Sequence, residues 1–178
     1  MAIRWALIKK KAGHLLEEAE VASAPVHIEA CAELLNATIR FQPLEGSVSG
    51  MVHKSSDGTA IIGINSLHSE TRQRFSIAHE IGHLSLHGGE DLHIDEERPS
   101  LIAFRDGNSS LGVDDKEIEA NQFAAELLMP EPLILKDYEK ISSKLKDGED
   151  IIEALSQLYK VSVQSMTIRL SKLGLFRA

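Results

Sequence analysis

Two histidines lie four residues apart, with a glutamate directly after the first, in the segment His79-Glu80-Ile81-Gly82-His83. Residues four apart in an α-helix share one face, so both imidazoles can reach the same metal ion. Glu80 then lies beside the ion, where it is placed to accept a proton from a water molecule. The alternative is a surface helix whose polar face carries two histidines by chance. The spacing therefore predicts a hydrolytic metal site, provided that the segment is helical.

Two histidines leave the site incomplete, because a catalytic zinc normally has three protein ligands and one position open to water. The segment 114–129 offers three glutamates as candidates, Glu117, Glu119 and Glu126. Glu117 and Asn121 are four residues apart, so Asn121 can hydrogen-bond a neighbouring ligand from the same helix face. Glu119 lies about 200° around the helix from Glu117 and cannot share that role. Spacing alone does not choose between Glu117 and Glu119.

The elements that must position these residues follow from hydrophobic periodicity and turn residues. Helices are expected at 2–23, 26–36, 70–87, 114–129, 133–145, 149–159 and 162–173. Three short strands are expected at 38–43, 48–53 and 59–64, joined as an antiparallel meander. Residues 88–113 are expected to form a loop, with a short strand at 101–104. The predicted fold class is α+β, with a three-stranded antiparallel sheet packed on the helices that carry the metal ligands.

The amino-acid composition indicates which broad class of protein this is. The chain has 178 residues, 43% hydrophobic and 26% charged, as expected of one soluble globular domain. No apolar run approaches the roughly 20 residues of a membrane helix, and we expect no signal peptide. The single cysteine, Cys31, cannot form an internal disulfide, so we expect a small buried residue in a cytoplasmic protein. A net charge of −8 argues against a nucleic-acid-binding protein.

The C-terminal part of the chain carries the opposite charge. After Glu153 there is no acidic residue, and the stretch contains four basic ones: Lys160, Arg169, Lys172 and Arg177. The run 152–175 resembles the second half of a helix-turn-helix, and a basic helix of that kind can contact phosphate. We favour a packed helical pair with a solvated basic face, which can also dock an acidic protein partner.

Two longer segments, 74–83 and 117–130, resemble the ImmA/IrrE family of metallo-endopeptidases, which are similar to a minimal gluzincin-type zinc peptidase. The first reads RFSIAHEIGH, the second reads EIEANQFAAELLMP, and the resemblance extends over most of residues 20–175. It implies one zinc ion per chain, and it favours Glu117, because the third ligand in that family is the glutamate three residues before the Ala-Asn pair. On this basis we expect a zinc metallopeptidase domain at 1–132 and a C-terminal helical segment at 133–178, packed on it.

The resemblance also implies roles for individual residues. His79, His83 and Glu117 hold the metal, Asn121 supports a ligand, and Glu80 moves the proton from the attacking water to the leaving amine. The strand 59–64 is expected to flank the cleft as an edge strand and to pair with an extended substrate. Its substrate-binding residues are then Ile61, Ile62 and Gly63. The candidates for stabilising the oxyanion, which we do not rank, are His53, His93, Tyr138 and Tyr159.

A substrate class follows only from the resemblance. Family members are similar to site-specific proteases that cleave helix-turn-helix repressors and so relieve repression of stress or mobile-element genes. We therefore expect a protein substrate of that class, no membrane partner and no direct nucleic-acid binding. The competing hypothesis is a non-catalytic, metal-binding regulatory or antitoxin-like protein, although a structural metal site has no need of Glu80.

Overall fold

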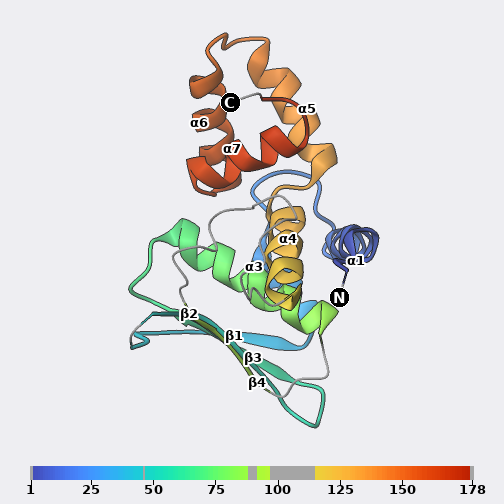
Figure 1. Ribbon diagram of the computed structural model, residues 1–178, viewed down its shortest axis with the longest axis vertical. Coiled ribbons are helices and arrows are strands. Elements are labelled where there is room, and N and C mark those ends of the chain that lie inside the picture. The colour runs from blue at the N-terminus through green and yellow to red at the C-terminus, as the bar shows by residue number, and fades with distance from the viewer. Residues whose placement is uncertain (1, 46, 88–91, 97–114, 177–178) are drawn as a thin grey trace.

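The computed structural model describes residues 2–45, 47–87, 92–96 and 115–176 (Figure 1). In chain order its elements are α1 (Trp5–Glu18), α2 (Ile28–Leu34), β1 (Ala37–Gln42), β2 (Val48–Lys54), β3 (Ala60–Asn65), α3 (Glu70–Leu86), β4 (Leu92–Glu96), α4 (Asp115–Leu128), α5 (Glu131–Ser142), α6 (Gly148–Tyr159) and α7 (Val163–Lys172). The predicted α+β class is confirmed. None of the helices described is both long enough and apolar enough to cross a bilayer.

The sheet is mixed and has four strands in the order β1-β3-β2-β4. β1 runs parallel to β3, whereas β2 runs antiparallel to both β3 and β4. The predicted three-stranded antiparallel meander is therefore wrong in strand number and in one pairing. Alternation of apolar and polar residues indicates a strand but does not identify the strands it pairs with. The sequence pattern therefore did not reveal that β3 separates β1 from β2. The fourth strand lies within the stretch predicted as a loop, and the strand expected at 101–104 falls outside the described residues.

β3 is an internal strand, because Ile62 pairs with Ile39 of β1 on one side and Val52 of β2 on the other. Both of its edges are occupied, so Ile61, Ile62 and Gly63 have no free backbone groups for an extended substrate. The expectation that this strand is an edge strand beside the cleft is wrong. The edge strands of the described sheet are β1 and β4; β4 pairs with β2 and, within the ranges described, with no other strand.

The helices that carry the candidate ligands pack directly on one another. α3 lies over one face of the sheet, α4 packs on α3, and α1 lies beside α4 (Figure 1). A Cβ atom at Gly82 would lie 3.1 Å from both the Cα and the carbonyl oxygen of Ala120, and 3.2 Å from the Cβ of Phe123. Glycine is therefore what permits α3 to meet α4 backbone to backbone.

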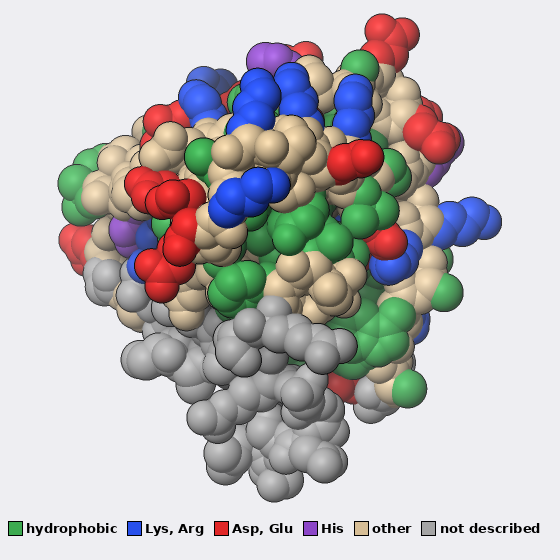
Figure 2. Space-filling view, turned by 90° about the horizontal axis from the view of Figure 1, so that it is seen from above, with side chains coloured by type: hydrophobic (Ala, Val, Ile, Leu, Met, Phe, Trp, Pro, Cys, Tyr) green, Lys and Arg blue, Asp and Glu red, His purple; other side chains and the backbone are tan. Residues whose placement is uncertain are grey.

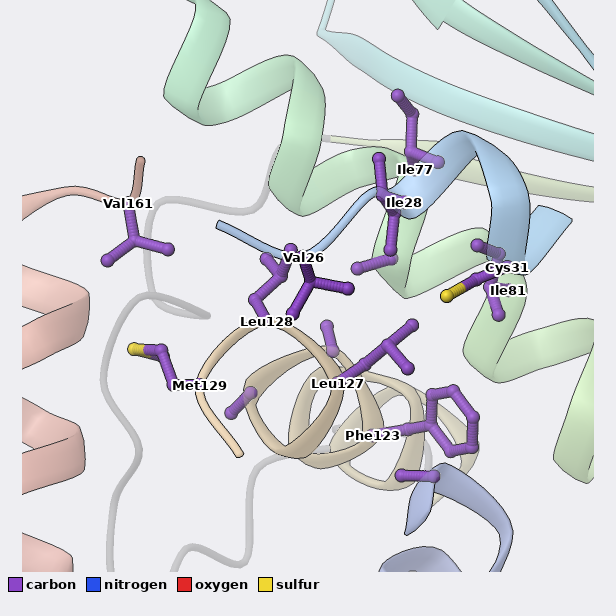
Figure 3. Close-up of a cluster of buried hydrophobic side chains, with 14 of the residues drawn as sticks. Val26, Ile28, Cys31, Ile77, Ile81, Phe123, Leu127, Leu128, Met129 and Val161 are labelled. Atoms are coloured by element: carbon purple, nitrogen blue, oxygen red, sulfur yellow. The ribbon is translucent and has the colours of Figure 1, made fainter. Parts of the chain in front are cut away.

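One part of the hydrophobic core fills the space between α2, α3 and α4 (Figure 3). Apolar side chains from these elements and the segments beside them meet there, including Val26, Ile28, Ile77, Ile81, Phe123, Leu127 and Leu128. Cys31 is fully buried among them, as predicted, and burial raises the pKa of its thiol to about 11. This cysteine is therefore a packing residue and not a nucleophile.

The C-terminal helices α5–α7 are attached to the rest of the chain by the basic residues that the sequence singled out. Arg169 is buried and forms two hydrogen bonds to the carboxylate of Glu126 on α4, at 2.9 and 2.6 Å. Its Nε donates to the carbonyl oxygen of Met129 at 3.0 Å. Lys160 pairs with Glu70 of α3, and Lys172 donates to the side chain of Gln122 on α4. The solvated basic face predicted for this segment is therefore wrong for Arg169, because that residue faces the protein interior.

The tail carries further exposed basic charge on α5 and just after it. Lys136, Lys140 and Lys144 follow one another at intervals of four residues and are all exposed, as are Lys160 and Lys172. Figure 2 looks onto the end of the molecule formed by these helices and shows basic side chains gathered along one edge, with acidic ones nearby. The division of the chain at residue 132 stays a prediction.

The close approach of α3 and α4 predicts a specific packing defect. Replacing Gly82 with Ala forces a methyl group against the Ala120 backbone and should lower the free energy of unfolding by about 1–3 kcal/mol. Gly13→Ala in α1 is the control, because no atom lies within 4 Å of the added Cβ. That change should raise the free energy of unfolding by about 0.5–1 kcal/mol. Urea denaturation measures both, and equal stability of the two variants would contradict the packing argument.

The buried ion pair predicts a large effect of Arg169→Met. The change leaves the Glu126 carboxylate buried without its cation and should lower the free energy of unfolding by about 3–5 kcal/mol. Lys160→Met removes a pair whose side chains are 51% and 69% exposed, so it should change stability little. Thermal and urea unfolding distinguish the two cases. If Arg169→Met is as mild as Lys160→Met, the tail is not attached through this pair.

Candidate metal centre

α3 presents His79, Glu80 and His83 from its middle, where all three side chains are buried. The Nε2 atoms of the two histidines lie 3.0 Å apart and face a common point. His79 is oriented by Asn121 of α4, whose Oδ1 accepts a hydrogen bond from Nδ1 at 3.1 Å. With the ring proton on Nδ1, Nε2 keeps its lone pair for a metal ion.

Glu117, in the first turn of α4, completes this set of donor atoms. Its two oxygens lie 3.4 Å from Nε2 of His79 and 3.3 Å from Nε2 of His83. Burial opposes ionisation, but the hydrogen bonds with both histidines outweigh it and hold the pKa of Glu117 well below its usual range. The structure therefore brings His79, Glu80, His83, Glu117 and Asn121 into one place.

Glu119 points elsewhere. Its carboxylate accepts hydrogen bonds from the backbone N–H and Nε of Arg4, each at 2.9 Å, and also from the end of that guanidinium. His87 lies on the same side, with Nε2 3.6 Å from Glu119, and burial lowers its pKa. The hydrogen-bond donors to Glu119 belong to Arg4, which precedes it by 115 residues, so helix spacing could not reveal this contact.

The donor set fits a metal ion. A tetrahedral zinc site with bonds of about 2.0–2.1 Å has neighbouring donors about 3.3–3.4 Å apart. The distances among His79, His83 and Glu117 are 3.0–3.4 Å. Burial lowers the pKa of both histidines, but hydrogen bonding with Glu117 and nearby carboxylates raises that of His79 to about 9, whereas that of His83 falls to about 4. Two imidazoles and a carboxylate are the kinds of donor that a divalent cation such as zinc binds.

Glu80 lies beside this centre in a dry environment. Both of its carboxylate oxygens are buried and have no hydrogen-bond partner among the residues described. Burial raises the pKa of Glu80 to about 8; His79 opposes the shift, and the carboxylates of Asp95 and Glu117 add to it. Gly50 of β2 leaves room for the carboxylate, because a Cβ there would lie 3.1 Å from Oε1. This group can exchange a proton near neutral pH.

β4 adds two residues at the centre, His93 and Asp95. The His93 Nε2 lies 3.3 Å from Oε1 of Glu117, and its ring stacks on that of His83 with centroids 3.6 Å apart. One oxygen of Asp95 forms a second compact group with His79 and Glu80. Sequence reasoning expected a loop here. The available signal was the alternation His-Ile-Asp, which puts the polar side chains on one face of a strand.

Of the four candidates for stabilising an oxyanion, His93 alone lies at the centre. The hydroxyls of Tyr138 and Tyr159 donate to the carbonyl oxygen of Leu175 and to Asp137, within the C-terminal helices. His53 is exposed on β2, next to Val52, which faces the core. The three residues expected to bind substrate, Ile61, Ile62 and Gly63, are separated from β4 by β2.

Comparison with known proteins gives the chain a family. The family model described as the IrrE N-terminal-like domain, of a peptidase family, matches residues 32–171. No curated protein sequence matches the chain. A solved structure named as a Mycobacterium tuberculosis transcriptional regulator has a similar fold, with a TM-score of 0.60 and 17% sequence identity. The match covers 92% of this chain but 46% of the regulator, so the chain spans about half of that protein. The chain therefore belongs to the IrrE N-terminal-like peptidase family, and its histidine–glutamate cluster lies within the matched range.

Proposed function

We propose that the chain is a zinc-dependent endopeptidase of the gluzincin type, which hydrolyses a peptide bond in a protein substrate. The observation that carries this proposal is the position of Glu80, buried without a hydrogen-bond partner beside the donors of His79, His83 and Glu117. A purely structural metal site gains nothing from such a carboxylate, whose burial costs free energy. A hydrolytic site, in contrast, needs a group that transfers a proton, and this carboxylate can do so.

Each residue has a defined task in this reaction. Zinc held by His79, His83 and Glu117 would supply a Lewis acid that polarises the scissile carbonyl and makes a water molecule more acidic. Glu80 accepts the proton of the attacking water and passes it to the leaving amine, for which its raised pKa is suited. Asn121 keeps His79 in the orientation that directs Nε2 at the ion.

β4 is the candidate binding site for an extended substrate. It is the edge strand next to the donors, because His93 and Asp95 reach the centre from it. An extended peptide added to the side of β4 that faces away from β2 would form backbone hydrogen bonds with no requirement for sequence, and side-chain pockets would add specificity. This proposal replaces the pairing first expected at Ile61, Ile62 and Gly63.

The proposed substrate is a helix-turn-helix transcriptional repressor, whose cleavage would relieve repression. Support comes from the family and from the similar structure, which is named a transcriptional regulator. Direct binding to nucleic acid is disfavoured by the net charge of −8 and by the contacts that Arg169 and Lys172 make within the chain. The second candidate, a non-catalytic metal-binding regulator, is favoured by a single observation, the presence of His93 as a further donor.

Replacing Glu80 with Gln tests the proposed reaction. The amide cannot accept the proton, so cleavage of a helix-turn-helix repressor that the wild type cleaves should fall by at least about a hundredfold while the zinc content stays the same. Glu70→Gln, an exposed position on the same helix, is the control and should behave as the wild type. Cleavage is followed by gel and mass spectrometry, with and without chelator. Undiminished cleavage by the Glu80 variant would refute the mechanism.

Glu117 and Glu119 provide a matched test of the ligand assignment. Glu117→Ala removes a direct donor, so zinc affinity should fall by more than the roughly 10–100-fold that is typical of a supporting residue. Glu119→Ala removes a partner of Arg4 and should leave zinc affinity unchanged. Competition with a chromophoric chelator measures both, with circular dichroism to check folding. The opposite ranking would show that Glu119 is the ligand.

A further inference from the structure

We propose that His93 is a fourth protein ligand, so that the metal is held in a closed site of three histidines and one glutamate until β4 withdraws the His93 side chain. The inference rests on the proposed function, since it takes His79, His83 and Glu117 as ligands. It adds a latent state to that function. Four protein ligands are typical of a closed site, and three with an open position are typical of a catalytic one.

The distances support a fourth ligand. One donor atom from each of the four residues lies within 4.8 Å of every other. The His93 Nε2 is 3.3 Å from the Glu117 oxygen, which equals the distance from that carboxylate to Nε2 of His83. Neighbouring donors in a tetrahedral zinc site are separated by about the same distance. His93 is thus placed within the donor set itself, and not behind it as a supporting residue.

The surroundings of His93 hold it in this position. Its side chain is 18% exposed, and its ring stacks on that of His83 with centroids 3.6 Å apart. It pairs in register with Val52 of β2, a buried residue, so it projects from the face of the sheet that packs on α3. A histidine directed to the interior from an edge strand loses solvation, and this loss is offset when the ring binds a cation.

Among the described strands, β4 lies at one edge of the sheet. Within the ranges described, it is held to the sheet by β2 alone, and the register of that pairing shifts between Val48 and Gly50. Edge strands with such irregularities are less firmly held than internal strands. The strand that forms this edge of the described sheet, to which we propose an extended peptide pairs, therefore also carries the fourth ligand. Pairing of a substrate with β4 would therefore directly affect the position of the His93 side chain.

Metal binding by the full-length chain tests the proposal without reference to activity. His93→Ala should reduce zinc affinity at least about tenfold, since even supporting residues contribute 10–100-fold. His53→Ala, on the neighbouring strand and facing away, should match the wild type. In the cobalt-substituted wild type, azide should leave the visible absorption spectrum unchanged because no position is open. In His93→Ala, azide should alter it. His93→Gln serves as a second variant if the alanine variant unfolds.

The outcomes separate this inference from the proposed function. Failure of the wild type to bind zinc or cobalt would refute both. Tight binding with equal affinity in the His93 and His53 variants, or a wild-type cobalt spectrum that azide changes, would refute the fourth ligand and leave the proposed function intact. At saturating zinc, His93→Ala should cleave the repressor faster than the wild type. Loss of cleavage with unchanged affinity would overturn the proposal and make His93 a catalytic donor instead.

Discussion

The contact between the backbones of α3 and α4 governs the geometry of the metal centre. Gly82 lies between the two histidines of the motif, and Ala120 lies between Glu117 and Asn121. Metal sites tolerate errors of only about 0.2 Å in their ligand distances, so the spacing of these helices must be closely defined. A shift of α4 by less than one residue would separate the Glu117 carboxylate from both imidazoles. The sheet beneath α3 and the helix α1 beside α4 support this contact from outside.

α4 is fixed by three carboxylates that find different partners. Glu117 faces the histidines of α3, Glu119 binds Arg4 at the start of α1, and Glu126 binds Arg169 of α7. A buried carboxylate without a positive partner is strongly unfavourable, so each one disfavours any other orientation of the helix. The hydrophobic core fixes which face of α4 is buried, and the three carboxylates fix its position along and around its axis.

Local periodicity accounts for what could be predicted from the sequence. The helix with His79 and His83 and the helix with Glu117 follow from spacings of three to four residues. The choice of Glu117 over Glu119 followed from the family resemblance, and the structure brings Glu117 to the two histidines. Partners distant in the chain could not be predicted in this way. The carboxylate of Glu119 is held by hydrogen bonds from Arg4, which lies far away in the sequence. The internal position of β3 depends on which strands pair with it. β4 was missed because its inward-facing side chains, His93 and Asp95, are polar; they are partly buried where they face the donors of α3 and α4.

An ion held at this centre would join segments that are far apart in the chain, since its donors come from α3, β4 and α4. It would act as a cross-link that exists only in the folded state. Such binding adds about 4 kcal/mol to stability when the free metal exceeds its dissociation constant a thousandfold. The supply of metal would then influence how long each molecule survives proteolysis, and so its abundance, in addition to its activity. When metal is scarce, less of the protein would be present even if its synthesis were unchanged.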